Sequence, residues 1–321
     1  MNAFPTRRAS ELEASAPQER WLVEPLWADQ AVGILGGEPK SCKSMLALEL
    51  AVAVASGAPC LRRFPVTRPG IVLLFAGEDA LPVVRSRLEM IARASGVDFV
   101  RLEVHLITAP TLRIDIEEQR RRLSDTVDQL RPRLLVLDPF VRLHRIDENL
   151  AAEVTPLLAF LRDLQRRFQT AVALVHHARK TAHVRPGQAL RGSSELHAWG
   201  DSNLYLNRRH NQLLLTVEHR AAPAPEPLVL ELRATEETLA LEIAGSAEPL
   251  SEDLNRQVPG TSPADRVLQA LSGAARPITR RALRESSRMR ASTVGQTLAQ
   301  LLQDGKIEEE NGRDRLPPTM P

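Results

Sequence analysis

The chain has few aromatic residues and almost no net charge. Aromatic side chains make up only 3% of the 321 residues, with a single tyrosine, so the core must be built from leucine, valine, alanine and isoleucine. Recognition of RNA by an aromatic sheet that stacks bases is thereby disfavoured. The formal net charge is +2, from 42 basic and 40 acidic residues, so nucleic-acid binding cannot be inferred from the total charge and depends on local clusters.

Cysteines and long apolar runs are also scarce. The two cysteines, Cys42 and Cys60, are too few for a disulfide framework or a zinc site, which favours a reducing, cytoplasmic setting. No apolar run approaches the length that spans a bilayer, and residues 1–20 lack the apolar centre of a signal peptide. We therefore expect a cytoplasmic protein with no membrane partner.

The most informative segment runs from Gly36 to Ser44 and reads Gly-Gly-Glu-Pro-Lys-Ser-Cys-Lys-Ser. It lies between an apolar run at 31–35 and an alanine- and leucine-rich stretch at 45–55, the strand–loop–helix setting of the phosphate-binding motif G-x-x-x-x-G-K-[ST]. In that motif, backbone N–H groups surround the phosphates, the lysine reaches the β- and γ-phosphates, and the hydroxyl ligates Mg²⁺. The expected nucleotide-binding residues are Gly37, Glu38, Pro39, Lys40, Ser41, Cys42, Lys43, Ser44 and Met45.

One position departs from this motif, because Cys42 stands where glycine is expected. Glycine adopts positive φ without a steric penalty, which lets the loop close tightly around a phosphate. Cys42 must therefore either tolerate backbone strain or alter the loop. Lys40 is either a solvated side chain or a second positive charge near the phosphates.

Apolar strands alternate with amphipathic helices over the first half of the chain, which predicts an α/β fold with a mainly parallel sheet and helices on both faces. The expected strands are 31–35, 71–76, 102–107, 134–138 and 171–175, and the expected helices are 45–55, 82–94, 116–130 and 150–168. Four further strands follow without helices between them, at 203–207, 212–217, 228–232 and 239–243. We expect these to extend the sheet as antiparallel strands.

Polar residues end several of these strands, and such ends gather at one edge of a parallel sheet. Asp138 follows four aliphatic residues and is expected to hold Mg²⁺ together with Ser44. Glu78 is the candidate base that activates the attacking water, with Asp79 as a neighbouring alternative and helix capping as a structural one. His176 and His177 point to opposite faces of their strand, so at most one of them can serve the site.

These motifs together resemble RecA-like ATPases of the RepA-type hexameric replicative helicase family. The likeness covers roughly residues 21–243 and rests on 37–44, 77–79, 137–139, 176–180 and 191–194. It implies a RecA-like core that binds ATP and Mg²⁺, assembles into a homo-oligomeric, hexameric ring, and couples hydrolysis to movement on single-stranded DNA. The departure at Cys42 puts tight nucleotide binding, and with it fast turnover, in doubt.

The resemblance also implies roles for individual residues. By position, Lys43 and Ser44 match the family's nucleotide-binding residues, Glu78 its catalytic carboxylate, Asp138 its Mg²⁺ ligand and His177 its phosphate sensor. Arg191 looks like the arginine that completes a neighbouring subunit's site, although a plain loop arginine is an equal alternative. Other basic residues nearby that could take this part are Arg179, Lys180, Arg208 and Arg209.

The C-terminal region has a different pattern, with three short helices followed by a turn, and resembles a winged helix. The expected division is a polar segment at 1–20, a RecA-like domain at 21–244, a linker at 245–262 and a winged helix at 263–321. Between residues 276 and 306 there are seven basic and two acidic residues, which favours contacts to duplex DNA phosphates. The expected DNA-binding residues are Arg280, Arg281, Arg284, Arg288 and Arg290. A protein-interaction role is the alternative.

The sequence therefore predicts an ATP-hydrolysing, DNA-associated motor, a RepA-like ring helicase in DNA replication or a related DNA transaction. Two other classes fit the same motifs. One is an ATP-dependent switch that organises partners on DNA, and the other is a nucleotide-bound scaffold without DNA contact.

Overall fold

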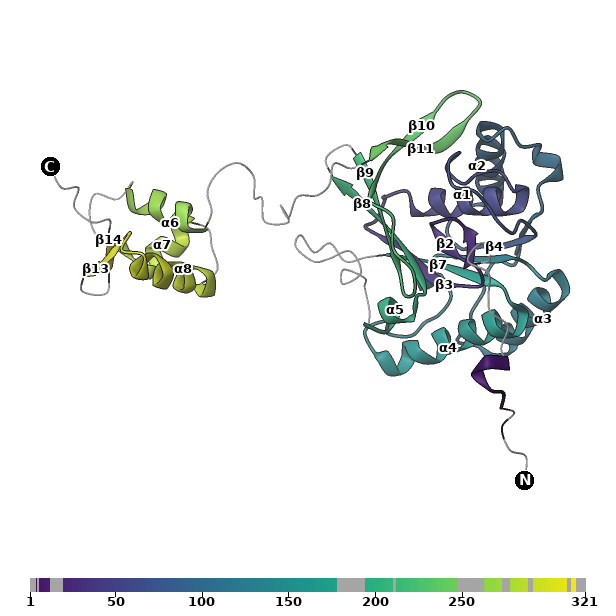
Figure 1. Cartoon of the computed structure of the whole chain (residues 1–321), viewed down its shortest axis with the longest axis horizontal. Coiled ribbons are helices and arrows are strands. Elements are labelled where there is room, and N and C mark those ends of the chain that lie inside the picture. The colour runs from purple at the N-terminus through teal and green to yellow at the C-terminus, as the bar shows by residue number, and fades with distance from the viewer. Residues whose placement is uncertain are drawn as a thin grey trace. The chain divides into compact units, whose positions relative to one another are not determined.

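The computed structural model describes residues 4, 6–11, 20–177, 194–209, 212–246, 263–272, 278–287, 291–310 and 313–315. The chain divides into two compact units, residues 1–249 and residues 250–321 (Figure 1). No helix among these described residues is both long and apolar enough to cross a membrane.

The first unit is built on a nine-stranded sheet with the order β11-β10-β9-β8-β3-β7-β6-β4-β5. Its parallel part comprises β3 (Val32–Gly37), β4 (Val72–Ala76), β5 (Val104–Leu106), β6 (Leu134–Asp138) and β7 (Ala171–His177). The remaining strands are β8 (Ser202–Arg209), β9 (Gln212–His219), β10 (Leu228–Ala234) and β11 (Leu239–Ser246). The predicted parallel sheet with added antiparallel strands, which is the RecA-like arrangement, is confirmed.

One detail of the expected sheet is wrong, because β8 pairs with β3 in parallel and the antiparallel part begins only at β9. The connection from β7 to β8 contains the short helix α5 (Ser194–Trp199). A connection of that length can return the chain to the starting end of the sheet, as a parallel pairing requires.

Helices cover both faces of this sheet (Figure 1). On one face, α1 (Lys43–Ser56) and α2 (Leu81–Ala94) contribute to an aliphatic core. On the other face, α3 (Glu117–Leu130), α4 (Ala151–Phe168) and α5 form a second core with the strands. Strands buried on both sides need apolar residues at every position, which explains the continuous apolar runs in the sequence.

A small hairpin that the sequence did not predict closes one end of the unit. It consists of β1 (Trp21–Val23) and β2 (Trp27–Ala28). His219 of β9 joins it to the main sheet, because its Nε2 donates to the carbonyl of Pro25 at 2.8 Å and its Nδ1 accepts from the Ser202 hydroxyl at 3.0 Å. Burial lowers the pKa of His219, although the bond to Pro25 opposes this.

A buried ion pair anchors the β10–β11 hairpin to α1. The Glu49 side chain is 1% exposed and lies 3.1 Å from the Arg62 guanidinium. Its carboxylate also accepts the backbone N–H of Leu241 at 2.8 Å, while Arg62 donates to the Leu241 carbonyl. Burial raises the pKa of Glu49, and Arg62 opposes that shift. Both backbone groups of Leu241 are thereby tied to charges that α1 holds.

The second unit contains three helices and a small sheet. Its elements are α6 (Pro263–Ser272), β12 (Ile278–Thr279), α7 (Arg280–Ser287), α8 (Ala291–Gln303), β13 (Glu308–Glu310) and β14 (Arg313–Arg315). The sheet order is β12-β14-β13. As the helical spacing predicts, Val294, Leu298 and Leu301 of α8 are buried in the core of this unit, and Leu302 packs against it.

Candidate nucleotide-binding site

The phosphate-binding loop joins β3 to α1 and begins at a glycine that no other residue could replace. Gly37 has a φ of 152°. A Cβ at this position would lie 2.1 Å from the backbone oxygen of Leu206 on β8, far inside contact distance. The absence of a side chain therefore lets the loop start directly beside β8.

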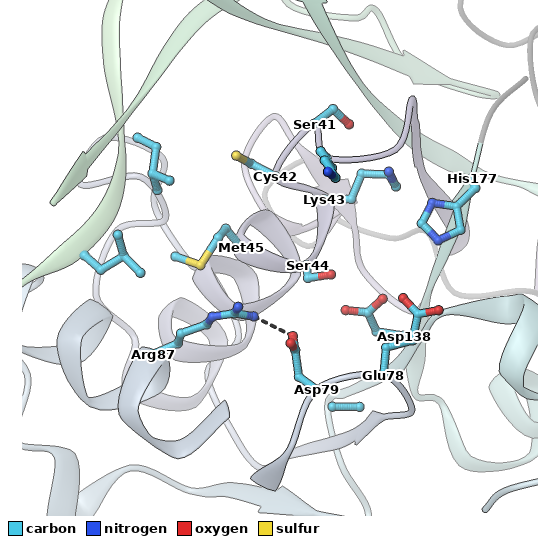
Figure 2. Close-up of a pocket in the computed structure, with 14 residues that line it drawn as sticks. Ser41, Cys42, Lys43, Ser44, Met45, Glu78, Asp79, Arg87, Asp138 and His177 are labelled. Carbon is cyan, nitrogen blue, oxygen red and sulfur yellow. Dashed lines mark hydrogen bonds and ion pairs between the residues drawn. The ribbon is translucent and has the colours of Figure 1, made fainter. Parts of the chain in front are cut away.

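Cys42 takes the backbone conformation that glycine takes in the motif. It lies at the N-cap of α1 with φ 63° and ψ 26°, in the left-handed region. For a residue with a Cβ this conformation costs about 1 kcal/mol. Of the two outcomes that the sequence allowed, the structure has the strained backbone and not an altered loop. The half-exposed thiol lies on the pocket wall (Figure 2).

Lys43 begins α1, and its side chain is buried inside the loop that it follows. Its Nζ donates to the backbone carbonyl of Glu38 at 2.6 Å. Burial lowers the pKa of Lys43 to about 8, although the negative charge of Asp138 raises it. The buried Oγ of Ser41 makes no hydrogen bond to any residue that the structure describes. The loop therefore offers a cation and a spare hydroxyl, which suit an anionic, hydrogen-bonding ligand such as a phosphate.

Asp138 ends β6 and faces Ser44, the second residue of α1. The Ser44 hydroxyl donates a hydrogen bond to the Asp138 carboxylate. Burial raises the pKa of Asp138 to about 6, and the nearby carboxylates of Asp79 and Glu78 raise it further, against the Ser44 bond and the Lys43 charge. This hydroxyl and carboxylate fit Mg²⁺, which usually takes only one or two protein ligands and otherwise binds water and phosphate oxygens.

Glu78 and Asp79 follow β4 and turn to different partners. Figure 2 shows Glu78 beside Asp138, on the side of His177, while Asp79 is ion-paired with Arg87 of α2. Glu78 instead lies 3.3 Å from the Nε of Arg142. The capping interpretation of Glu78 is wrong, because α2 begins at Leu81 and its N-cap residue is Ala80.

The two histidines at the end of β7 lie in different surroundings. His177 lines the pocket with its ring toward Lys43 (Figure 2). His176 is 2% exposed, and its ring packs near Phe140 with centroids 5.9 Å apart. Its Nε2 is 3.9 Å from Glu148, on the side of the strand away from the pocket. Only His177 is therefore placed to meet a ligand, in agreement with the alternation along a strand.

These residues surround one pocket of about 370 Å³, which is large enough for a nucleotide. Its lining comprises Lys40, Ser41, Cys42, Lys43, Ser44, Met45, Ala76, Glu78, Asp79, Arg87, Asp138, His177, Leu232 and Leu239. Of the expected nucleotide-binding residues, Gly37, Glu38 and Pro39 do not line it, although Glu38 holds Lys43 through its carbonyl. Lys40 is exposed at its edge.

Three of the lining residues were missed in the sequence. Arg87 comes from α2, and Leu232 and Leu239 come from the β10–β11 hairpin. Leu232 is 42% exposed, which is unusual for a large aliphatic side chain in a core-forming strand. No motif marks these positions, because the two leucines belong to an ordinary strand pattern almost two hundred residues after the phosphate-binding loop.

Comparison with known proteins agrees with this geometry. The sequence model of a family described as "AAA domain" matches residues 3–183, more than half of the chain. The chain belongs to this family. No curated protein matches it significantly. The solved ATPase domain of a helicase superposes with a TM-score of 0.52 at 13% identity, over 66% of this chain and 84% of that one, which shows a shared fold. The RadB recombinase superposes with a TM-score of 0.48 at 19% identity, over 66% and 91% of the two chains.

The region of this AAA domain protein that matches the family contains the phosphate-binding loop, Glu78, Asp138 and His177. Arg191 lies beyond the match and outside the described residues. The same holds for Arg288, Arg290 and the side chain of Arg281. In the second unit, Arg280 and Arg284 are exposed, and Arg280 lies 3.3 Å from Glu309 of β13.

Proposed function

We propose that this AAA domain protein binds and hydrolyses ATP with Mg²⁺. The observation that carries the proposal is the convergence of Lys43, Ser44, Glu78, Asp138 and His177 on one pocket at the carboxyl ends of parallel strands. These residues lie on or directly after α1, β4, β6 and β7, so the fold alone gathers them. Ligands of open α/β sheets bind at this edge.

Each side chain has a task that its position supports. Lys43 would exchange its bond to the Glu38 carbonyl for a phosphate oxygen, and Ser44 with Asp138 would hold Mg²⁺. Mg²⁺ supplies neutralisation of the phosphate charge. Glu78 would accept a proton from the attacking water, and His177 would donate a hydrogen bond to the γ-phosphate.

The pocket changes character along its length in the way that a nucleotide does. The charged and hydroxyl groups gather at the loop, whereas Met45, Leu232 and Leu239 offer aliphatic surface elsewhere on the wall. Arg87 adds a planar guanidinium. A triphosphate suits the first part and a flat heterocyclic base suits the second. Base recognition here would use aliphatic packing and not aromatic stacking.

We further propose that the protein works on DNA as a RepA-like ring, a hexamer in which Arg191 of one subunit completes its neighbour's site. The motif order resembles that family over residues 21–243. The second unit would be a winged helix that binds duplex DNA through the exposed Arg280 and Arg284, because its three helices and three short strands occur in winged-helix order.

The deciding experiment is ATP turnover with and without single-stranded DNA. Lys43→Ala should abolish nucleotide binding, whereas Glu78→Gln should preserve binding and remove turnover. Glu118→Gln, which changes an exposed carboxylate on α3, serves as the matched control and should leave both unchanged. Turnover stimulated by DNA supports a motor, and binding with negligible turnover supports a switch. Nucleotide binding that Lys43→Ala leaves intact overturns the proposal.

A further inference from the structure

The inference concerns Arg142, which ends the short helix η4 (Phe140–Arg142) directly after Asp138. Phe140 anchors this helix, because it is fully buried and its ring lies 4.3 Å from that of His144. Arg142 itself is 59% exposed. A buried residue thus fixes the helix, while its last side chain reaches the surface beside the proposed catalytic residues.

The side chain of Arg142 lies across the two residues that follow β4. A Cβ on Gly77 would be 3.0 Å from the Cβ of Arg142 and 3.3 Å from its Cγ, so the arginine stem uses the space that glycine leaves. The Nε then donates to the Glu78 carboxylate at 3.3 Å. Packing of the stem and pairing of the head both direct Arg142 to Glu78.

The neighbouring carboxylate has a separate arginine. Asp79 pairs with Arg87, which lines the pocket and would meet a bound nucleotide. Arg142 is not among the described residues that line the pocket. A ligand inside the pocket therefore acts on the pair of Asp79 and Arg87, whereas the pair of Glu78 and Arg142 is open to a polyanion outside it.

We propose that Arg142 restrains Glu78 and that the phosphodiester backbone of a DNA strand competes for Arg142 and so frees Glu78. This rests on the proposed ATPase function. Once freed, Glu78 accepts a proton from water, whose oxygen forms a bond to the γ-phosphorus. The bond from that phosphorus to the β–γ bridging oxygen breaks, and ADP leaves with the electron pair. Arg142 is thus a positioning residue that couples strand binding to turnover.

The exposure of the pair suits such a competition. An ion pair between solvent-exposed side chains changes an equilibrium constant by at most about fivefold, so a phosphate can replace the carboxylate at little cost. A buried pair, such as that of Glu49 and Arg62, could not exchange its partner in this way, because one charge would remain buried and unpaired.

The first test measures DNA affinity without nucleotide, by fluorescence anisotropy of a labelled oligo(dT) at low salt. Because Glu78 competes with the strand for Arg142, Glu78→Gln should tighten binding about two- to fivefold. Arg142→Ala should weaken binding, and adding Glu78→Gln to it should change nothing more. Asp79→Asn is the matched control for the loss of one negative charge. An equal gain from Glu78→Gln with and without Arg142 overturns the proposal.

The second test measures turnover on the full chain. Arg142→Ala should raise the DNA-free kcat about two- to fivefold, leave KM for ATP unchanged and reduce stimulation by oligo(dT). Arg142→Lys should restore the low DNA-free rate in part, and Arg145→Ala, an exposed arginine of the same segment, should resemble the native chain. A DNA-free rate that Arg142→Ala leaves unchanged or lowers overturns the coupling. An absence of turnover in the native chain would instead overturn the proposed ATPase function.

Discussion

The Lys43 ammonium donates a hydrogen bond to the Glu38 carbonyl, and the two atoms are 2.6 Å apart. These residues lie at opposite ends of the phosphate-binding loop, so the lysine closes the loop on itself. Cys42 holds the intervening turn in its left-handed conformation. A phosphate that binds here replaces the hydrogen bond of Lys43 and does not have to rebuild the loop.

Cys42→Gly should stabilise the protein and hardly change its affinity for nucleotide. Glycine adopts a φ of 63° without the penalty that a Cβ brings, which exceeds the extra entropy of glycine in the unfolded chain by about 0.5–1 kcal/mol. Urea unfolding measures the gain, and a nucleotide titration should show a change in Kd below about threefold, because the loop already has its binding shape.

Cys42→Ala is the matched control, since it removes the thiol and keeps the Cβ. It should leave the free energy of unfolding close to that of the native chain. A large rise in turnover for Cys42→Gly, without one for Cys42→Ala, would show that the strained backbone slows hydrolysis and that the loop is not preformed.

Leu232→Ala should weaken ATP binding without weakening the binding of inorganic tripolyphosphate. The side chain lies on the aliphatic part of the pocket, and losing about 1 kcal/mol of apolar contact raises KM for ATP about fivefold. Competition of each compound with a fluorescent nucleotide checks the difference. Val100→Ala, at a position 91% exposed, is the control. Equal weakening of both compounds would place Leu232 at the phosphates.

Acid should destabilise the first unit through His219. Burial lowers its pKa in the folded state, so the folded protein binds fewer protons than the unfolded chain, where the pKa is about 6.5. The stability that His219 contributes is therefore complete above pH 6.5 and is lost as the pH falls through the folded-state pKa.

His219→Gln supplies a group that cannot titrate in this range. The difference in free energy of unfolding between the native chain and this variant should shrink as the pH is lowered from 8 to 5, at about 1.4 kcal/mol per pH unit or less. Urea unfolding at each pH measures it. A difference that stays constant over this range would mean that His219 does not control the acid response.

Glu309→Gln should tighten the binding of duplex DNA by the full chain. Glu309 lies 3.3 Å from Arg280, so it competes with DNA phosphates for one of the proposed DNA-binding arginines. Arg284→Ala should weaken binding and lower the slope of log affinity against log salt by about one. Titration at several salt concentrations measures both effects. An unchanged slope for Arg284→Ala would favour a protein-interaction role for this unit.

The sequence predicts the parallel sheet well because its strands are buried on both faces and leave continuous apolar runs. It does not predict β1 and β2, which contain three and two residues and carry no such run. The phosphate end of the pocket was predicted from local motifs. The aliphatic end was not, because Leu232 and Leu239 reach it only through long-range packing of the hairpin.

The buried pair of Glu49 and Arg62 also determines how the pocket can move. Through both backbone groups of Leu241 it fixes the β10–β11 hairpin to α1, the helix that begins at the phosphate-binding loop. The walls that would contact base and phosphate therefore form one rigid half. The opposite half carries Glu78 on the segment after β4, held by an exposed ion pair. Rearrangement during turnover thus belongs to the carboxylate half, while the nucleotide stays with the rigid one.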